Sequence, residues 1–272
     1  MSVILPSLNV VNYIEECLDS VTGQTLEELE ILCIDAGSTD GTLEILQKYA
    51  DKDKRIRLIH SDKKSYGYQI NLGIDQASGE YMGIVETDDY IEPKMYEELY
   101  QTASEENLDY VKAGFDVFVT PGKEERYCLR YPMSDFNQVI SSEYFMEKEL
   151  SNDIYIWNGI YRLSFLKEHA IRLNESPGAA FQDCSFRYLV DIKLNRGMFL
   201  DRSFYRYRRD NCSSSTYNPH CVRYNLEECK YIRKWMEKQK DMDVKKHSFI
   251  ARETVMMALE PYSTLRGVSE PD

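Results

Sequence analysis

The sequence predicts an α/β protein with a mainly parallel central sheet flanked by helices, followed by a helical C-terminal extension. Over the first 85 residues, short apolar runs alternate with helical patterns, and each strand–helix–strand repeat has the spacing of a βαβ unit. Beyond about residue 218 the pattern is helical and rich in charge. We therefore expect an α/β domain at residues 1–215 and a helical extension at residues 216–272.

The expected elements of the first half follow one another closely. Apolar runs predict strands at residues 3–5, 30–34, 56–59 and 81–85. Apolar residues at helical spacing predict helices at residues 13–21, 43–49 and 68–77. In such a parallel sheet, ligands bind beyond the carboxyl ends of the strands. Acidic segments at residues 35–40 and 86–89 both follow strands, which is the first indication of a functional site.

The second half of the chain is less regular. Strands are expected at residues 110–111, 117–119, 198–200 and 204–207, with a loop or hairpin at residues 122–126. Helices are expected at residues 142–150, 162–169 and 183–191. Many of the 21 tyrosines lie in this half. They indicate either ordinary packing or a surface that stacks sugars.

Composition narrows the class of protein. The chain carries 46 acidic and 33 basic residues, for a net charge of -13. Binding to nucleic acid needs a basic face, so this charge argues against such a partner, whereas a metal ion can still bridge acidic side chains to a diphosphate. The seven cysteines have no CxxC or zinc-site spacing, which favours reduced thiols and the cytoplasm.

Membrane and export signals are not found by pattern. No apolar run approaches the roughly 20 residues that cross a bilayer. The N-terminus enters an apolar strand at once, without the basic region and cleavage site of a signal peptide. The expectation is a protein that is soluble or attached only to a membrane surface.

Carboxylates are concentrated at the end of the expected strand 81–85, in Glu86-Thr87-Asp88-Asp89. Carboxylates this close repel one another, so gathering them at one strand end is unfavourable without a cation. Mg²⁺ and Mn²⁺ prefer oxygen ligands, usually one or two carboxylates completed by substrate phosphates. The pattern is that of a divalent metal site, and the alternative is a solvated acidic turn in which Asp89 caps the next helix.

A set of motifs in a fixed order resembles a known family. Its members are Pro6-Ser7-Leu8-Asn9, Gln24-Thr25, Ile34 to Thr42, Gly79-Glu80-Tyr81, Glu86 to Asp89, Trp157 to Arg162, Phe181 to Phe186 and Tyr205 to Arg208. Together they resemble family 2 of the glycosyltransferases, the inverting group with the nucleotide-diphosphosugar transferase (GT-A) fold. The resemblance covers residues 2–216.

The resemblance implies roles by position. Asp88 would bind the metal on the donor diphosphate, Asp89 would share that task, and Asp183 would be the general base on the acceptor hydroxyl. The residues implied to contact the donor nucleotide are Pro6, Asn9, Asp35, Glu86 and Thr87. The residues implied on the acceptor side are Trp157, Asn158, Arg206 and Arg208. The two arginines, with Arg209, would bind diphosphate or acceptor, or else serve in packing.

A polar loop precedes the expected helix 68–77. The segment from Lys63 to Asn71 combines glycine and polar residues, and a helix N-terminus favours anions. Gln69 and Asn71 are therefore candidates for contact with the donor phosphates or sugar. An ordinary loop and helix start explains the segment equally well.

Four positions depart from the family pattern, and one departure, Glu86 in place of the first aspartate of the DxD motif, is mild. Ala36 stands where the second of two aspartates commonly reads a uracil edge, and Leu8 stands where an aromatic residue often stacks on the base. The resemblance therefore does not fix uridine as the nucleoside. Gln182 replaces a glutamate that often precedes the catalytic aspartate, which leaves Asp183 as the carboxylate at that point.

The function that follows is metal-dependent, inverting sugar transfer. A nucleotide-diphosphosugar would be the donor, the hydroxyl of a glycan or lipid-linked molecule the acceptor, and Mg²⁺ or Mn²⁺ the cofactor, with a role in surface polysaccharide or glycan synthesis. One alternative, a sugar-phosphate nucleotidyltransferase, needs a glycine-rich, arginine-bearing loop after the first strand, which is lacking. The other is an inactive homologue that binds a glycan or a partner, and the presence of Asp88 and Asp183 argues against it.

The local charge reverses sign between residues 223 and 247. Basic residues surround Ile232 and Trp235 there, as in helices that lie on anionic membranes. This pattern suggests contact with the inner membrane face. Interspersed acidic residues favour the alternative, a solvated helix that packs Trp235 on the first domain.

Overall fold

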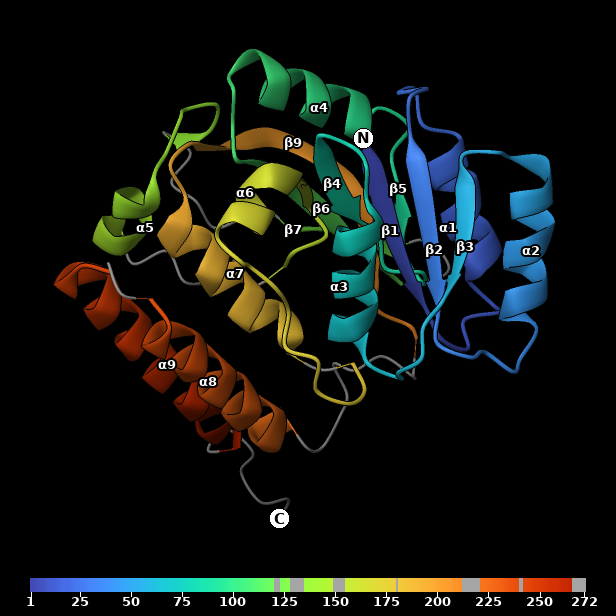
Figure 1. Cartoon of the computed structure of the whole chain (residues 1–272). Coiled ribbons are helices and arrows are strands. Elements are labelled where there is room, and N and C mark those ends of the chain that lie inside the picture. Colours follow the sequence, from blue (N-terminus) through green and yellow to red (C-terminus); the bar gives the residue numbers. More distant parts are fainter. Residues whose placement is uncertain are drawn as a thin grey trace.

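The computed structural model describes residues 1–119, 123–127, 135–148, 155–179, 181–211, 221–239 and 242–265. Within these ranges one sheet of nine strands crosses the molecule, and helices lie on both of its faces (Figure 1). The strand order is β3-β2-β1-β4-β8-β6-β9-β5, and β7 pairs with β6 outside this path.

The first four strands are parallel, as predicted. The strand β1 (Ser2–Ser7) lies between β2 (Glu30–Asp35) and β4 (Tyr81–Ile84), and β3 (Ile56–His60) pairs with β2. The helices of the crossovers are α1 (Ile14–Thr22), α2 (Thr42–Lys52) and α3 (Tyr66–Gln76). Strands β1 and β4 are buried along their whole length, as expected for parallel strands covered on both faces. Their carboxyl ends meet at one edge of the sheet.

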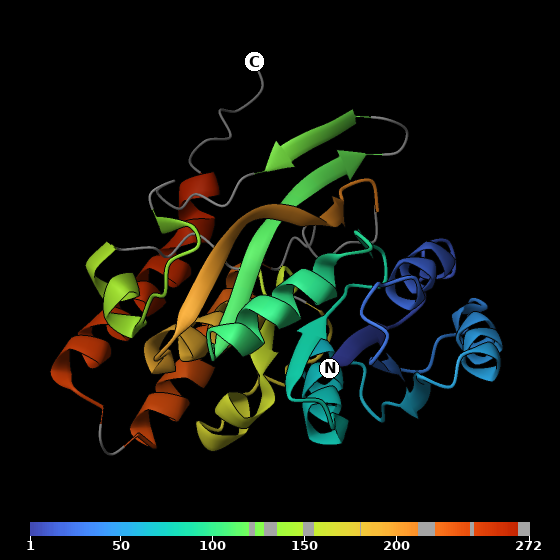
Figure 2. The same ribbon diagram turned by 90° about the horizontal axis from the view of Figure 1, so that it is seen from above.

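The second half of the sheet is mixed. The strand β8 (Gly159–Arg162) is antiparallel to β4 and to β6 (Tyr110–Val119), whereas β9 (Gly197–Arg208) runs parallel to β6. The short β5 (Tyr90–Ile91) pairs antiparallel with β9, and β7 (Lys123–Tyr127) forms the predicted hairpin with β6 (Figure 2). The sheet is thus parallel from β1 to β4 and between β6 and β9, and antiparallel where β8, β5 and β7 pair.

Two long strands each looked like a pair of short ones in the sequence. In β6 the register shifts between Ala113 and Phe115, which interrupts the alternation of side chains. In β9 the exposed residues Asp201 and Arg202 separate the two apolar stretches. Local pattern therefore divided each strand, although the ladder between β6 and β9 continues through both interruptions.

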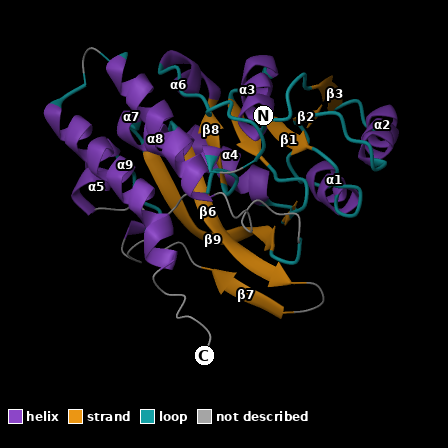
Figure 3. Cartoon of the chain, turned by 90° about the horizontal axis from the view of Figure 1, so that it is seen from below, coloured by secondary structure: helices purple, strands orange, loops and turns teal. Residues whose placement is uncertain are grey.

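Helices gather at the end of the molecule opposite α2 (Figure 3). Of the remaining helices, α4 (Met95–Glu105) and α6 (Leu163–Glu168) lie against the sheet. The others pack on one another: α5 (Ser142–Lys148), α7 (Gln182–Lys193), α8 (Cys221–Glu237) and α9 (Val244–Leu265). The predicted domain boundary at 215/216 lies outside the described residues.

Two apolar residues of α8 face the protein. Ile232 is fully buried and Trp235 is 7% exposed, with the Lys193 ammonium 5.4 Å from the Trp235 ring centroid. The packing alternative for Trp235 is therefore correct. A membrane contact through residues 223–247 could not use these two side chains, and residues 240–241 of that segment lie outside the described ranges. Among the described helices, none is long and apolar enough to span a bilayer.

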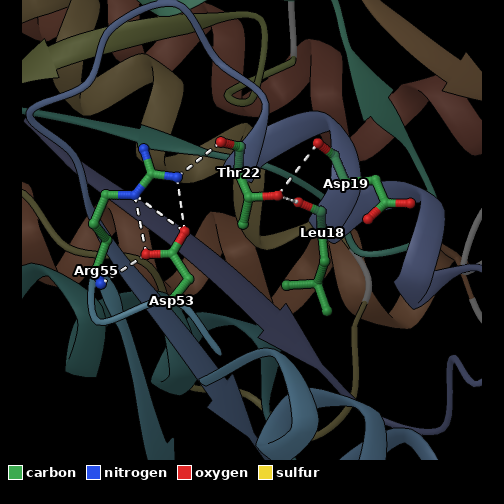
Figure 4. Close-up of polar contacts among 5 residues, drawn as sticks. All are labelled: Leu18, Asp19, Thr22, Asp53 and Arg55. Carbon is green, nitrogen blue, oxygen red and sulfur yellow. Dashed lines mark hydrogen bonds and ion pairs between the residues drawn. The ribbon is translucent and has the colours of Figure 1, made fainter. Parts of the chain in front are cut away.

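A partly buried polar cluster joins the end of α1 to the turn before β3 (Figure 4). The Arg55 guanidinium donates to both carboxylate oxygens of Asp53 and, at 2.8 Å, to the carbonyl oxygen of Thr22. The Thr22 hydroxyl in turn donates to the carbonyl oxygen of Leu18. Hydrogen bonding from Arg55 lowers the pKa of Asp53, so the ionised pair favours the folded state.

Substitution of Arg55 tests how much these hydrogen bonds stabilise the protein. We expect Arg55→Ala to lower the free energy of unfolding by roughly 1–2 kcal/mol, because it removes charge-assisted hydrogen bonds at a partly buried site. Lys48→Ala is the control, since Lys48 and Glu15 form an exposed pair at 3.3 Å and such pairs contribute about 0.5 kcal/mol or less. Urea unfolding of both variants measures the difference, and equal losses would contradict the assignment.

Candidate active site

The acidic segment turns sharply after β4. Strand pairing continues as far as Val85, whose N–H donates to the carbonyl oxygen of Ile4. The Asp89 N–H then closes a turn on the Glu86 carbonyl oxygen, and the Thr87 hydroxyl donates to the Pro6 carbonyl oxygen at 2.8 Å. Thr87 is buried and joined to the end of β1, so its hydroxyl anchors the turn.

Asp88 and Asp89 point in different directions. Asp89 is 1% exposed, and its two carboxylate oxygens accept from the Tyr205 hydroxyl at 2.9 Å and the Arg208 N–H at 2.7 Å. Burial, together with the charge of Asp88, holds the pKa of Asp89 well above its usual range. Asp88 is half-buried, and its carboxylate accepts from the Asn211 side chain at 2.7 Å. The geometry thus uses Asp89 to attach β9 and leaves Asp88 nearer the surface.

Glu86 binds a proton more readily than an ordinary glutamate. It accepts a hydrogen bond from the Tyr66 hydroxyl, and burial, with the charges of Asp88 and Asp183, raises the pKa of Glu86 to about 8. Within the described part of the chain, no three His, Cys, Asp or Glu side chains converge as a ready set of metal ligands. A site for Mg²⁺ or Mn²⁺ needs fewer, because one or two carboxylates and substrate phosphates suffice. The donor set therefore fits such a cation.

Asp183 lies in the first turn of α7. Phe181 precedes it with a φ of 63°, in the left-handed region, and this turn starts the helix. The Cys184 N–H donates to Asp183 at 3.0 Å. Burial raises the pKa of Asp183 to about 6, against the opposing effects of backbone hydrogen bonds and the Lys112 ammonium. The helix N-terminus also favours the carboxylate form.

A backbone clamp brings α7 and α3 to the same place. Gly178, with a φ of 85°, bridges to Ser65. The Tyr66 N–H donates to the Gly178 carbonyl oxygen at 2.9 Å, and the Gly178 N–H donates to the Lys64 carbonyl oxygen at 2.8 Å. Tyr66, which the sequence analysis did not single out, thereby reaches Glu86 from beside Asp183.

The predicted nucleoside residues organise two loops. The Asp35 carboxylate accepts from the N–H groups of Gly37 and Ser38, each at 2.9 Å, and from the Ser38 hydroxyl. Asn9, with a φ of 55°, accepts from the Thr39 N–H at 2.9 Å and donates its own N–H to the Ser38 hydroxyl. Pro6 lies near the end of β1, Asn9 follows that strand, and Asp35 is the last residue of β2, so all three predicted residues lie at the carboxyl ends of β1 and β2.

Gln69 and Asn71 use their amides within the protein. Gln69 donates to the carbonyl oxygens of Ser7 at 3.0 Å and Ile34 at 2.6 Å, which ties β1 to β2. Asn71 both donates to and accepts from the backbone of Leu173. These contacts explain both residues as structural supports, and contact with a donor sugar remains a prediction.

The predicted acceptor residues are buried as well. Trp157 is 5% exposed and stacks on Tyr205 at 4.1 Å and on Tyr207 at 5.3 Å between ring centroids. Asn158 is fully buried and donates to the Ala113 carbonyl oxygen.

Both predicted arginines form ion pairs. Arg206 pairs with Asp116 at 2.5 Å and Glu92 at 2.8 Å, and Arg208 pairs with Glu16. The packing alternative given for these arginines thus matches their contacts, and a ligand-binding role stays a prediction.

The sequence is similar to those of known glycosyltransferases. Residues 2–170 match the model of the family described as Glycosyl transferase family 2. The chain belongs to this family. It is 32% identical over 225 residues to the uncharacterized glycosyltransferase EpsJ of Bacillus subtilis, covering 81% of the chain and 64% of EpsJ. It is 28% identical over 218 residues to the uncharacterized glycosyltransferase YibD of Escherichia coli, covering 79% of the chain and 63% of YibD. The chain thus spans less than two thirds of the length of these relatives.

Solved glycosyltransferase structures share the fold. Residues 1–349 of S. aureus TarS, in complex with UDP-GlcNAc, superpose with a TM-score of 0.76 at 22% identity, over 95% of this chain and 72% of that one. The mannosyltransferase PcManGT of Pyrobaculum calidifontis, in complex with GDP-Man and Mn²⁺, gives a TM-score of 0.59 at 11% identity, over 99% of this chain and 76% of that one. The predicted GT-A fold of this family-2 glycosyltransferase is confirmed.

Removal of one hydroxyl tests the attachment of β9 to the acidic turn. Tyr205→Phe takes away the group that donates to Asp89 and accepts from the Glu86 N–H. We expect a loss of about 2–3 kcal/mol in the free energy of unfolding, because two buried polar groups lose a partner. Tyr100→Phe is the control, since its hydroxyl makes only an exposed contact with Glu80 at 3.5 Å. Thermal and urea unfolding would refute the attachment if both variants behaved alike.

Proposed function

We propose that this glycosyltransferase moves a sugar from a nucleotide-diphosphosugar to an acceptor hydroxyl, with inversion and with Mg²⁺ or Mn²⁺. One observation carries the proposal: the acidic turn after β4 and the carboxylate of Asp183 lie close enough for the charge of Asp183 to raise the pKa of Glu86. The two are brought together from opposite halves of the chain.

Asp88 is the proposed metal ligand. Asp88 is half-buried, and the Arg208 guanidinium, which donates to the Asp88 carbonyl oxygen at 2.7 Å, holds its backbone in place. Asp89 supports this contact by accepting a hydrogen bond from the backbone N–H of Arg208. When bound, a divalent cation supplies positive charge that stabilises the departing diphosphate. Both solved complexes named above support a nucleotide-sugar donor, and one of them contains Mn²⁺.

Asp183 is the proposed base. In the displacement, the acceptor oxygen forms a bond to the anomeric carbon while the bond from that carbon to the diphosphate oxygen breaks. The proton of the acceptor hydroxyl passes to the Asp183 carboxylate, and the electron pair of the broken bond leaves with the diphosphate. A pKa of about 6 suits this task, because the carboxylate is ionised at neutral pH yet more basic than an ordinary aspartate.

Recognition of the donor nucleobase and of the acceptor involves residues other than the metal ligand and the base. Ala36 is 3% exposed and offers no carboxylate to a base, and both oxygens of Asp35 are engaged in the turn. We therefore propose that the nucleobase is recognised without an acidic side chain at this point, and that the acceptor is a glycan or a lipid-linked sugar in surface polysaccharide synthesis.

Nucleotide binding tests the metal role. We expect UDP or GDP to bind in the presence of Mn²⁺ and to lose at least about 10²-fold in affinity in EDTA or in Asp88→Asn, because the metal joins the diphosphate to the protein. Asp62→Asn, which changes an exposed carboxylate 3.8 Å from His60, is the matched control. Calorimetric titration gives the affinities. Tight binding that persists in EDTA, or in the Asp88 variant, would reject the metal site.

Turnover tests the base. Asp183→Asn should lower kcat by about 10²–10⁴-fold and leave donor affinity nearly unchanged, whereas Glu168→Gln on the exposed end of α6 should do neither. The base acts when ionised, so the wild-type rate should fall about tenfold per pH unit below about pH 6 and level off above it. Donor hydrolysis and transfer, assayed by release of UDP or GDP, measure both effects. A pH-independent rate, or a variant that no longer binds donor, would assign Asp183 a different role.

A further inference from the structure

A buried carboxylate of α8 reaches the helix that carries Asp183. Glu228 is 1% exposed. Its Oε2 accepts from the Ser185 hydroxyl at 2.5 Å, and its Oε1 accepts from the Asn174 side chain at 2.8 Å. The displacement described above gives Glu228 no task, although isolated carboxylates are rarely buried without one.

Ser185 connects Glu228 to the first turn of α7. The single hydrogen of the Ser185 hydroxyl goes to the nearer acceptor, Glu228, and the Gln182 carbonyl oxygen lies 3.2 Å from the same Ser185 oxygen. The carbonyl of Gln182 belongs to the peptide bond that joins it to Asp183. Glu228 therefore acts on the first turn of α7 through a single side chain.

Asn174 connects Glu228 to the loop on the other side of Asp183. The Asn174 carbonyl oxygen lies so close to Gly67 that a Cβ there would be 1.9 Å from it, so this loop is seated against the first turn of α3. The Gln182 side chain closes the loop by donating to the Ser176 hydroxyl at 2.9 Å. Glu228 thus holds the chain at a point before Asp183 and at a point after it.

We propose that Glu228 is a positioning residue for the general base: by binding Ser185 and Asn174 together it fixes the first turn of α7, and with it the carboxylate of Asp183. The inference rests on the proposed function, because it assigns Asp183 the role of base. It makes the C-terminal helices part of the active site, although they lie outside the segment that matches the family.

The charge of Glu228 is not what the positioning requires. Burial raises the pKa of Glu228 to about 7, and the nearby charge of Asp183 adds to this effect. A neutral amide has the same shape and can hydrogen-bond to both Ser185 and Asn174, whereas methionine fills the space without polar contacts. Glu228→Gln and Glu228→Met therefore separate hydrogen bonding from packing.

Hydrolysis of a nucleotide sugar measures the effect on the reaction. The assay uses whichever of UDP-GlcNAc and GDP-mannose the wild-type protein hydrolyses faster with Mn²⁺, water taking the place of the acceptor. We expect Glu228→Met to lower kcat about tenfold or more with KM unchanged, and Glu228→Gln to restore most of it. Ser185→Ala, a smaller change, should reproduce the loss and serves if the methionine variant does not fold. Glu227→Met is the control, since the neighbouring Glu227 makes an exposed pair with Lys230 at 2.7 Å.

A double-mutant cycle and amide exchange exclude a merely structural role. In an Asp183→Asn background, Glu228→Met should have no further effect on kcat, because it acts through Asp183. Hydrogen exchange of residues 181–185 should quicken in Glu228→Met and Ser185→Ala but not in Glu227→Met. Unchanged exchange and kcat, additive effects in the cycle, or a rise in KM would overturn the proposal. Wild-type protein that hydrolyses neither donor would count against the proposed function, and exchange would still decide the positioning.

Discussion

The fold depends on how the acidic end of β4 is accommodated. A buried carboxylate without partners is strongly unfavourable, and Asp89 at 1% exposure is such a group unless donors are brought to it. Tyr205 and Arg208 supply the donors from β9, more than a hundred residues further along the chain. This contact fixes where β9 crosses the end of the parallel strands. It also leaves Asp88, the residue before Asp89, as the carboxylate nearer to a ligand.

A few backbone contacts also position the other half of the candidate site. The bridge between Gly178 and Ser65 sets α7 beside α3, so the Tyr66 hydroxyl meets Glu86 while Asp183 opens α7 nearby. Each of these groups lies at the end of a secondary-structure element: after a strand or at the start of a helix. Backbone donors are unpaired at such points, which is why carboxylates can be held there. The second half of the sheet acts mainly as the support that keeps these ends together.

Sequence pattern predicted the parallel strands but not the contacts that support the candidate site. Apolar periodicity placed Asp88 after the carboxyl end of a strand, whereas the role of Asp183 was implied by the resemblance to the family and stays a prediction. The structural roles of Gln69 and Asn71 did not, because their partners are 62 and 102 residues away and no local pattern records them. Trp157 was matched to the acceptor side by position alone, whereas its ring is stacked on Tyr205. The hydrogen bonds of Gln69 and Asn71 thus show a structural role that the sequence motif did not indicate.

The balance of charge around the site bears on how a donor enters. The charges of Asp88 and Asp183 both raise the pKa of Glu86, and the nearby cations have partners already: Lys112 donates to the Tyr155 carbonyl oxygen at 2.6 Å, and Arg208 pairs with Glu16. A free nucleotide diphosphate would therefore meet net repulsion. On the proposed function, the cation and the diphosphate favour each other's entry, since each reduces the charge that opposes the other. The acidic turn would then select for a metal-bound donor, and Asp183, set apart on α7, would remain free to take the proton of the acceptor.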